Sequence, residues 1–254
     1  MALHEVLADC AKLVRGHGHF MSDLGRQYEK ASDPPAVVLE RAFRFAAESL
    51  EAMSLLLKRG QFGLQAAMIC RGFYEISTRL LWATREKHGW RRLQIHWAKE
   101  DARFLKPIKD VPRFQEAVAT ELAELDGVVK QEDEDGKPLS NAPGMWETIQ
   151  AIDEMDRRDE VHVVSSDFPL KEYVIAWTSL CRAVHAHPSW LDRMRCEEAF
   201  DRQVVQAAVL AARNLLRAFC HCLPVEHMKE QLDLVEAEVV KLWSGVSPLS
   251  ERPE

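Results

Sequence analysis

The chain has 254 residues, 47% of them hydrophobic and 29% charged, which is the balance of a globular protein with one large domain or two small ones. A formal net charge of −7 excludes a protein that attracts nucleic acid over its whole surface. No uncharged run is long enough to cross a bilayer, and residues 1–16 interleave acids with apolar residues at helical spacing, unlike a signal peptide. We therefore expect a soluble, cytoplasmic protein that does not enter a membrane.

Helices are predicted along almost the whole chain, because apolar residues recur at intervals of three and four. Proline and glycine mark their ends, as at Pro34, Gly60, Gly89, Pro107 and Pro188. The predicted helices cover residues 1–30, 36–59, 62–88, 90–106, 113–130, 145–157, 170–187, 197–222 and 224–243. The fold class is therefore all-α: a bundle of about eight to nine helices, in a single domain over residues 1–245 with a disordered tail at 246–254.

The helices at 36–59 and 62–88 are expected at the centre of the bundle. A link of two or three residues around Gly60 makes them an antiparallel hairpin. The second helix is apolar on nearly all its faces, which is the pattern of a buried helix. We predict a central buried helix hairpin.

Two ionisable residues, Arg71 and Glu75, interrupt this apolar helix one turn apart. Residues at i and i+4 can meet on one face, and a buried charge is costly unless it is paired. The pair is either a structural brace that orients a neighbouring helix or part of a binding cleft completed by a third polar group. As a brace, it predicts that Glu75→Ala unfolds the protein by leaving Arg71 buried and unpaired.

Charge is unevenly distributed along the middle of the chain. Residues 85–113 hold nine bases and four acids, whereas residues 114–160 hold fourteen acids and four bases. The basic stretch at 85–113 is a candidate RNA-binding face. Alternatively, the two stretches are solvated helix faces of opposite sign that partly pair in the fold.

The six cysteines are irregularly spaced and lie mostly among apolar helical neighbours, which favours buried thiols in a reducing compartment over disulfides. Cys220, His221 and Cys222 do not make a metal site, because alternate residues of a helix point about 200° apart. Glycine-rich phosphate-binding loops are missing as well. Neither a metal nor a cofactor is expected.

The helix predicted at 170–187 carries the other candidate residues. Tyr173 and His185 lie on one face, three steps of four residues apart, and His187 follows at the end of the helix. Histidine titrates near neutral pH and can act as a general acid or base. It can equally hydrogen-bond a neighbouring side chain or the last carbonyls of its own helix.

The order of these motifs resembles a large bacterial all-helical family of unknown function. Arg71 and Glu75 form the Arg-x3-Glu of an apolar helix, and about a hundred residues later Tyr173 opens a Tyr…Ser-x3-His helix end that closes at His185. Cys181 stands where that family often has serine. The resemblance covers residues 35–190 and implies an all-helical fold in which Arg71, Glu75 and His185 form one constellation, but it implies no reaction.

Arg182 and His187 also resemble the signature of the HEPN superfamily of helical ribonucleases and nucleotide-binding proteins, an arginine followed four to six residues later by histidine. Ala183 departs from the polar residue that usually follows this arginine. The resemblance implies metal-independent RNA cleavage, with His187 as general acid or base and Arg182 steadying the phosphate charge. It also implies a homodimer, because paired protomers often build that site.

Two functions from different classes follow. The first is a binding or interaction module in which Arg71, Glu75 and His185 form a buried cluster beside Tyr173. The second is a HEPN-like ribonuclease of a bacterial defence or toxin system, with Arg182, His187 and His185 as candidate catalytic residues near the basic helix at 90–106. The distances among these residues in a structure distinguish the two.

Overall fold

The computed structural model describes residues 2–28, 36–60, 63–158, 177, 180–181, 198–223 and 225–246, and in these the protein is all-α. An isolated bridge between Glu132 and Pro138 closes a turn, and no strand forms in the described ranges. The helices are α1 (Leu3–Tyr28), α2 (Ala36–Lys58), α3 (Gly63–Arg85), α4 (Gly89–Leu105), α5 (Gln115–Val129), α6 (Met145–Arg158), α9 (Glu198–His221) and α10 (Val225–Ser244), with a short 3-10 turn, η1 (Lys106–Ile108), after α4.

The predicted fold class is confirmed, and the predicted helices agree with the observed ones to within about three residues at each end. Gly60 adopts a φ of 66° two residues after Lys58, the last residue of α2, so the chain leaves that helix in the left-handed conformation that glycine tolerates. The helix predicted at 170–187 lies mainly outside the described residues. Its described positions, Trp177, Leu180 and Cys181, are helical.

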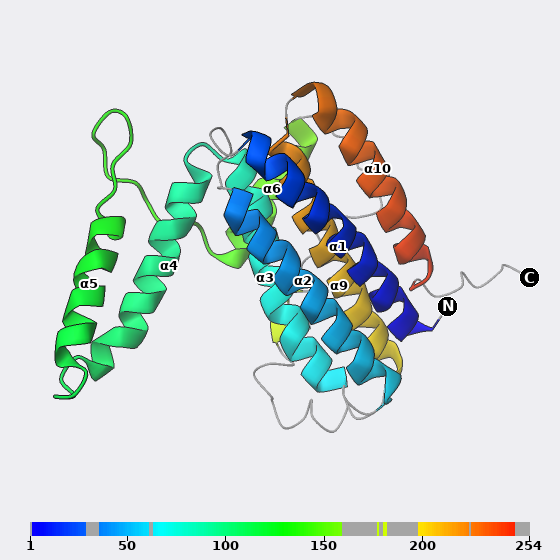
Figure 1. Cartoon of the computed structure of the whole chain (residues 1–254), viewed down its shortest axis with the longest axis horizontal. Helices are drawn as coiled ribbons and strands as arrows, with labels where there is room; N and C mark the ends of the chain where they lie inside the picture. The colour runs from blue at the N-terminus through cyan, green and yellow to red at the C-terminus, as the bar shows by residue number, and fades with distance from the viewer. Residues whose placement is uncertain are drawn as a thin grey trace, which may run out of the picture.

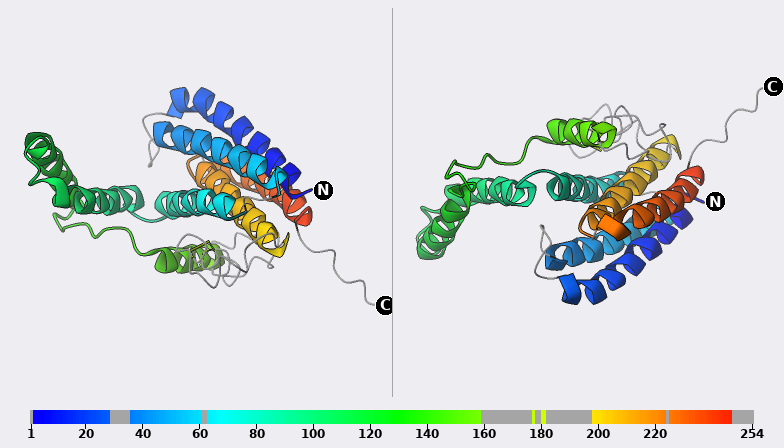
Figure 2. Two further views of the ribbon diagram at one scale, coloured as in Figure 1. Left: turned by 90° about the horizontal axis from the view of Figure 1, so that it is seen from below. Right: turned by 90° about the horizontal axis from the view of Figure 1, so that it is seen from above.

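The body, defined here as α1, α2, α3, α6, α9 and α10, is built in layers (Figures 1 and 2). α1 pairs with α2 along its length, and α3 pairs with α9. α10 packs against α9, while α6 packs on α3, on the side facing away from α1 and α2. No helix in the described ranges is both long and apolar enough to cross a membrane.

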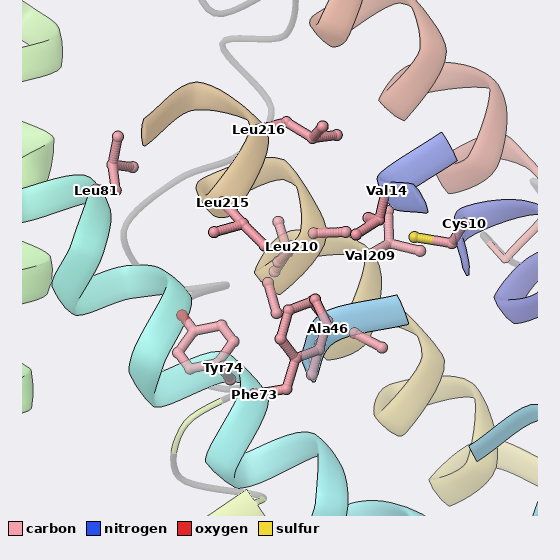
Figure 3. Packing of buried hydrophobic residues seen from close by; sticks show 14 of the residues in the cluster. Cys10, Val14, Ala46, Phe73, Tyr74, Leu81, Val209, Leu210, Leu215 and Leu216 are labelled. Carbon is pink, nitrogen blue, oxygen red and sulfur yellow. The ribbon is translucent and has the colours of Figure 1, made fainter. Parts of the chain in front are cut away.

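The most completely buried helix of the described residues is α9, which packs against the α2–α3 hairpin. Every side chain of α9 from Ala207 to Cys220 is buried, whereas α3 buries only part of its surface. Side chains of α1, α2 and α3 converge on α9, among them Val14, Ala46 and Phe73 (Figure 3). The predicted α2–α3 hairpin forms, and α3 packs against α9, where small residues along α9 let the other helices approach it from several sides.

Several of the buried side chains are cysteines. Cys10, Cys70 and Cys220 are buried, and none of the described cysteines forms a disulfide. Burial raises the pKa of the Cys10 thiol to about 12, so it stays protonated at neutral pH. These thiols act as small apolar groups, as the sequence predicted for them.

α4 and α5 leave the body as an arm, defined here as residues 89–129 (Figure 1). α4 continues from α3 after a sharp turn, and α5 returns along α4. The chain then runs back past the start of α4, where the Ala142 amide donates to the Arg92 carbonyl at 2.9 Å, before α6 begins. The arm is thus an excursion of the chain between α3 and α6.

The turn into the arm depends on Gly89. His88 takes a φ of 56°, and a Cβ on Gly89 would lie 2.6 Å from the backbone oxygen of Ala83. Because that neighbour is backbone, a rotamer change cannot relieve the clash. We expect Gly89→Ala to lower the free energy of unfolding by about 1–3 kcal/mol in urea denaturation. Gly16→Ala in α1, where nothing lies within 4 Å of an added Cβ, is the control and should leave stability unchanged or raise it.

Candidate functional site

Two clusters of ionisable side chains lie within the body and at its contact with α4, and they differ in exposure. The inner cluster is defined as Arg85, Asp156, Arg213, Arg217 and Glu236. The outer cluster is defined as Arg71, Glu75, Arg79 and His96. α3 contributes to both, so the two clusters share one helix but lie on different parts of it.

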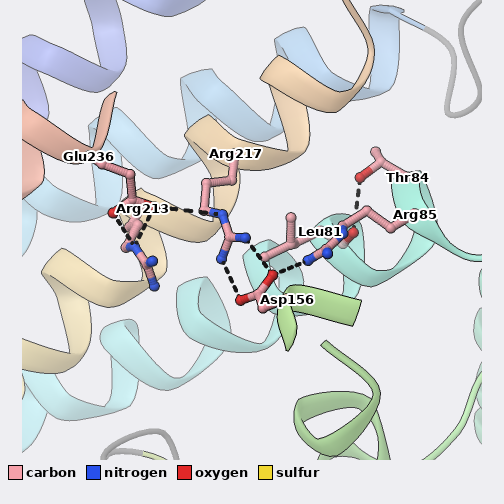
Figure 4. Close-up of polar contacts among 7 residues, drawn as sticks. All are labelled: Leu81, Thr84, Arg85, Asp156, Arg213, Arg217 and Glu236. Carbon is pink, nitrogen blue, oxygen red and sulfur yellow. Dashed lines mark hydrogen bonds and ion pairs between the residues drawn. The ribbon is translucent and has the colours of Figure 1, made fainter. Parts of the chain in front are cut away.

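The inner cluster is built on the buried helix α9 (Figure 4). Arg217, whose side chain is fully buried, donates to both carboxylate oxygens of Asp156 at 2.6 and 3.1 Å. Arg85 at the end of α3 binds the same carboxylate. One acid on α6 thereby joins α3, α6 and α9.

The other acid of the inner cluster is Glu236 on α10. Arg213 donates its Nε hydrogen to the carboxylate, with both oxygens within 2.9 Å. Arg217 Nε also lies 3.7 Å from Glu236 Oε1, which links the two halves of the cluster. Nearby, Asn214 of α9 donates to the Thr78 hydroxyl of α3 at 3.1 Å. Arg213, Asn214 and Arg217 of α9 therefore take their shortest side-chain contacts from α10, α3 and α6, respectively.

The protonation of Asp156 reflects this environment. Burial raises the pKa of this carboxyl, but the charges and hydrogen bonds of Arg217 and Arg85 outweigh burial, so the net pKa is lowered. The carboxylate is ionised at neutral pH and compensates two buried guanidinium groups. These contacts are short and almost closed to solvent, which is the arrangement of a structural brace.

One pattern in the sequence indicates the inner cluster, although the predicted site did not include it. Arg213 and Arg217 stand at i and i+4 inside the longest apolar face of the chain, as Arg71 and Glu75 do in α3. Two like charges at that spacing cannot pair with each other, so each needs an acid from another helix. Asp156 and Glu236 supply those acids, but nothing in their local sequence distinguishes them from surface residues.

The outer cluster contains the predicted pair. Arg71 Nη2 lies 3.7 Å from Glu75 Oε2. Each side chain is about 30% exposed, so the pair is less buried than the sequence predicted. The closer partner of Glu75 is Arg79, at 3.3 Å, and the Arg79 side chain is 6% exposed. Arg79 also donates to the Pro143 carbonyl at 3.1 Å. The buried charge that Glu75 compensates is thus Arg79 and not Arg71.

Arg71 is held by stacking more than by its ion pair. Its guanidinium carbon lies 5.0 Å from the ring centre of Trp177, and that ring also stacks on Tyr74 at 6.1 Å. The Nε of Arg71 is buried and has no hydrogen-bond partner among the described residues. A guanidinium held over an indole ring by a cation–π contact can still donate its terminal N–H groups to a planar anion.

His96 of α4 completes the outer cluster. Burial lowers the pKa of His96, and the positive charge of Arg79 lowers it further, against smaller opposing effects of Glu100 and Glu75. The imidazole is therefore neutral at pH 7 and can both donate and accept a hydrogen bond. The sequence does not single out this histidine, because its approach to α3 depends on the turn at Gly89.

The remaining predicted site residues, Tyr173, Arg182, His185 and His187, lie outside the described residues. Trp177, one of the three described residues of the predicted helix at 170–187, contacts Arg71 of the outer cluster. That His185 joins Arg71 and Glu75 in one constellation therefore stays a prediction.

The basic stretch at 85–113 divides into two parts. Near the body, Arg91 donates to the Glu132 carbonyl and Lys87 lies 3.8 Å from Glu134, so this part pairs with the acidic turn, as one of the two interpretations predicted. The distal bases make no ion pair in the described part of the chain and are exposed: Arg103, Lys106, Lys109 and Arg113. RNA binding there stays a prediction.

Two further observations bear on function. In the residues that the structure describes, no group of three or more histidine, cysteine, aspartate or glutamate side chains converges as a metal site. Comparison with family models, with curated proteins and with solved structures finds no match to this chain. The functional assignment therefore depends on the geometry of the clusters.

Proposed function

We propose that this protein is a non-catalytic binding module that takes a small anionic ligand, a carboxylate or a phosphate, at the outer cluster. The observation that carries this assignment is the state of Arg71, which is stacked on Trp177, loosely paired at 3.7 Å and about one third exposed. A structural arginine of this protein looks different: Arg217 is fully buried with contacts as short as 2.6 Å.

The charge of the outer cluster favours an anion. Arg71 and Arg79 outnumber Glu75, and His96 adds a neutral donor. The guanidinium group matches carboxylate and phosphate oxygens in a two-pronged hydrogen bond, which compensates the desolvation of both partners. A second guanidinium, Arg79, is too buried to take the ligand itself, but its positive charge adds to the attraction.

The test is thermal unfolding of the full chain with inorganic phosphate and, separately, with succinate. We expect each anion to raise the melting temperature by a few degrees at saturating concentration, because a ligand that binds only the folded state stabilises it. Sodium chloride at the same ionic strength should not do so. Arg71→Gln should abolish the shift while leaving the melting temperature of the free protein nearly unchanged, since this side chain is partly exposed.

Arg15→Gln is the matched control. Arg15 is also a half-exposed arginine in an ion pair, with Glu51, but it belongs to α1, which carries no residue of the outer cluster. It should keep the full response to both anions. An equal response in the wild type and in Arg71→Gln would show that the anions act elsewhere and would contradict the assignment.

The HEPN-like ribonuclease stays the alternative from the sequence. Its residues Arg182 and His187 lie outside the described part, so no contact there supports it. Incubation of the purified chain with structured and unstructured RNA tests it directly. Cleavage that is lost in His187→Ala and unaffected by chelators would replace the binding assignment.

A further inference from the structure

Glu75 of the outer cluster lies between two arginines of α3, one helical turn before it and one helical turn after it. Its Oε2 lies 3.7 Å from Arg71 Nη2, and its Oε1 accepts a hydrogen bond from Arg79 Nε at 3.3 Å. The contact with Arg71 is longer than a hydrogen bond, so the carboxylate attracts that guanidinium without satisfying its donors. One carboxylate is therefore divided unequally between two guanidinium groups.

The contact with Arg79 holds Glu75 in this position. The Arg79 side chain is 6% exposed, and its guanidinium also donates to the Pro143 carbonyl at 3.1 Å, so two contacts fix it in place. Arg71 and Glu75 are each about 30% exposed, so both side chains remain accessible from solvent. An anion that approaches Arg71 therefore meets a carboxylate that already lies beside the guanidinium.

We infer that Glu75 is a built-in competitor for the anion at Arg71, an inference that rests on the function proposed for the outer cluster. In the free protein, the Glu75 carboxylate lies against a terminal nitrogen of Arg71 that a bound carboxylate or phosphate also needs. A bound anion displaces Glu75 from Arg71 and leaves it on Arg79, where its charge stays compensated. Glu75 is thus a specificity-determining residue, because it sets how strongly an anion must bind to Arg71.

This competition selects anions that carry two or more oxygens. A carboxylate or phosphate can accept two parallel hydrogen bonds from one guanidinium, which together are stronger than the single long contact that Glu75 makes with Arg71. Chloride cannot form that pair of hydrogen bonds, and the charge of Glu75 repels it as it does any anion. The carboxylate of Glu75 therefore excludes weakly bound anions and admits those that the guanidinium recognises by shape.

The experiment is a phosphorus NMR titration of inorganic phosphate with the full chain at pH 7 and constant ionic strength. It measures the dissociation constant separately from the stability of the fold. Glu75→Gln removes the charge but keeps the shape of the side chain, and its amide oxygen can still accept from Arg79. We expect this variant to bind phosphate about fivefold more tightly than the wild type, the largest factor that an exposed ion pair usually contributes. Arg71→Gln should bind no phosphate.

Glu100→Gln is the matched control. Glu100 is an exposed acid one turn after His96 on α4, so its loss changes the charge near the outer cluster without releasing Arg71. It should change the dissociation constant by less than about twofold, because solvent and salt screen an exposed charge. Equal tightening in both variants would indicate a general effect of charge, and unchanged or weaker binding in Glu75→Gln would show that Glu75 does not compete. Either result overturns the inference while the anion site at Arg71 stands.

Glu75→Asp is the second variant, for the case that glutamine does not support the fold. It keeps a carboxylate near Arg79 but shortens the side chain, so the longer contact with Arg71 is lost first. It should also bind phosphate more tightly than the wild type, and equal or weaker binding overturns the inference. Phosphate that binds neither the wild type nor any Glu75 variant contradicts the proposed function itself, and the inference falls with it.

Discussion

Replacing Asp156 with alanine is expected to lower the free energy of unfolding by about 3–5 kcal/mol, the largest electrostatic effect that we expect from a single substitution in this protein. Asp156 is the carboxylate that compensates both Arg217, which is fully buried, and Arg85, whose side chain is 4% exposed. Its removal leaves those guanidinium groups without this counter-charge in a medium that solvates charge poorly. Urea denaturation followed by circular dichroism measures the loss.

Asp153→Ala on the same helix is the control. Asp153 pairs with Arg157, whose side chain is 74% exposed, so its loss should cost less than about 1 kcal/mol. If Asp153→Ala and Asp156→Ala proved equally stable, the inner cluster would not be a brace. A loss confined to the melting of α6, with the rest of the bundle intact, would show that Asp156 only fastens α6 to the surface.

The stabilisation by Asp156 also has a defined pH dependence. The folded-state pKa of this carboxyl is lowered, so its contribution is fully present above the unfolded-state pKa of about 3.9 and is lost as the pH falls through the folded-state value. The difference in stability between the wild type and Asp156→Asn should therefore be constant from about pH 5 to 8 and should shrink below about pH 4. A difference that grew on acidification would contradict the lowered pKa.

Phe219→Ala is expected to lower the free energy of unfolding by about 3–5 kcal/mol through loss of packing. Phe219 is 1% exposed, and its ring meets the edge of Phe43 from α2 at 6.1 Å and of His17 from α1 at 6.3 Å. It therefore joins α9 to both helices of the neighbouring layer, and the rigid neighbours cannot refill the space of a phenyl ring. The same urea denaturation measures it.

Phe45→Ala is the control for the ring deletion. Phe45 is 43% exposed on α2, next to the buried stretch but outside the core, so its loss should cost less than about 1.5 kcal/mol. Equal losses at both positions would mean that α9 is not the centre of packing. A Phe219→Ala variant that is as stable as the wild type would show that the contact between α9 and the α1–α2 layer contributes little.

The helices could be predicted from the sequence because each is a local pattern. Apolar periodicity and the positions of Gly60 and Gly89 place their ends, and these signals act within a few residues. Which helix is the most completely buried could not be predicted in this way. α3 and α9 are both apolar on most faces, and the choice depends on how closely other helices approach, which the small residues of α9 decide.

The candidate site was predicted only in part, because only its local contact follows from the sequence. Arg71 and Glu75 are close in sequence, so their contact follows from helical geometry. Their exposure and the stronger contact of Glu75 with Arg79 depend on what packs against that face of α3. The inner cluster joins residues separated by 61 and 71 positions, such as Arg217 and Asp156, and no local pattern reveals such a pairing.

The arm leaves the body after α3 and returns before α6, and Arg85 and Asp156 close this path with a contact across 71 positions. The entropy lost in closing a loop grows only with the logarithm of its length, by about 0.6 kcal/mol for each doubling. Adding or removing a helical turn in both helices of the arm therefore changes the stability of the bundle very little. The length of the arm can therefore be set by the molecule that its end contacts, and the helices that support the arm need not change with that length.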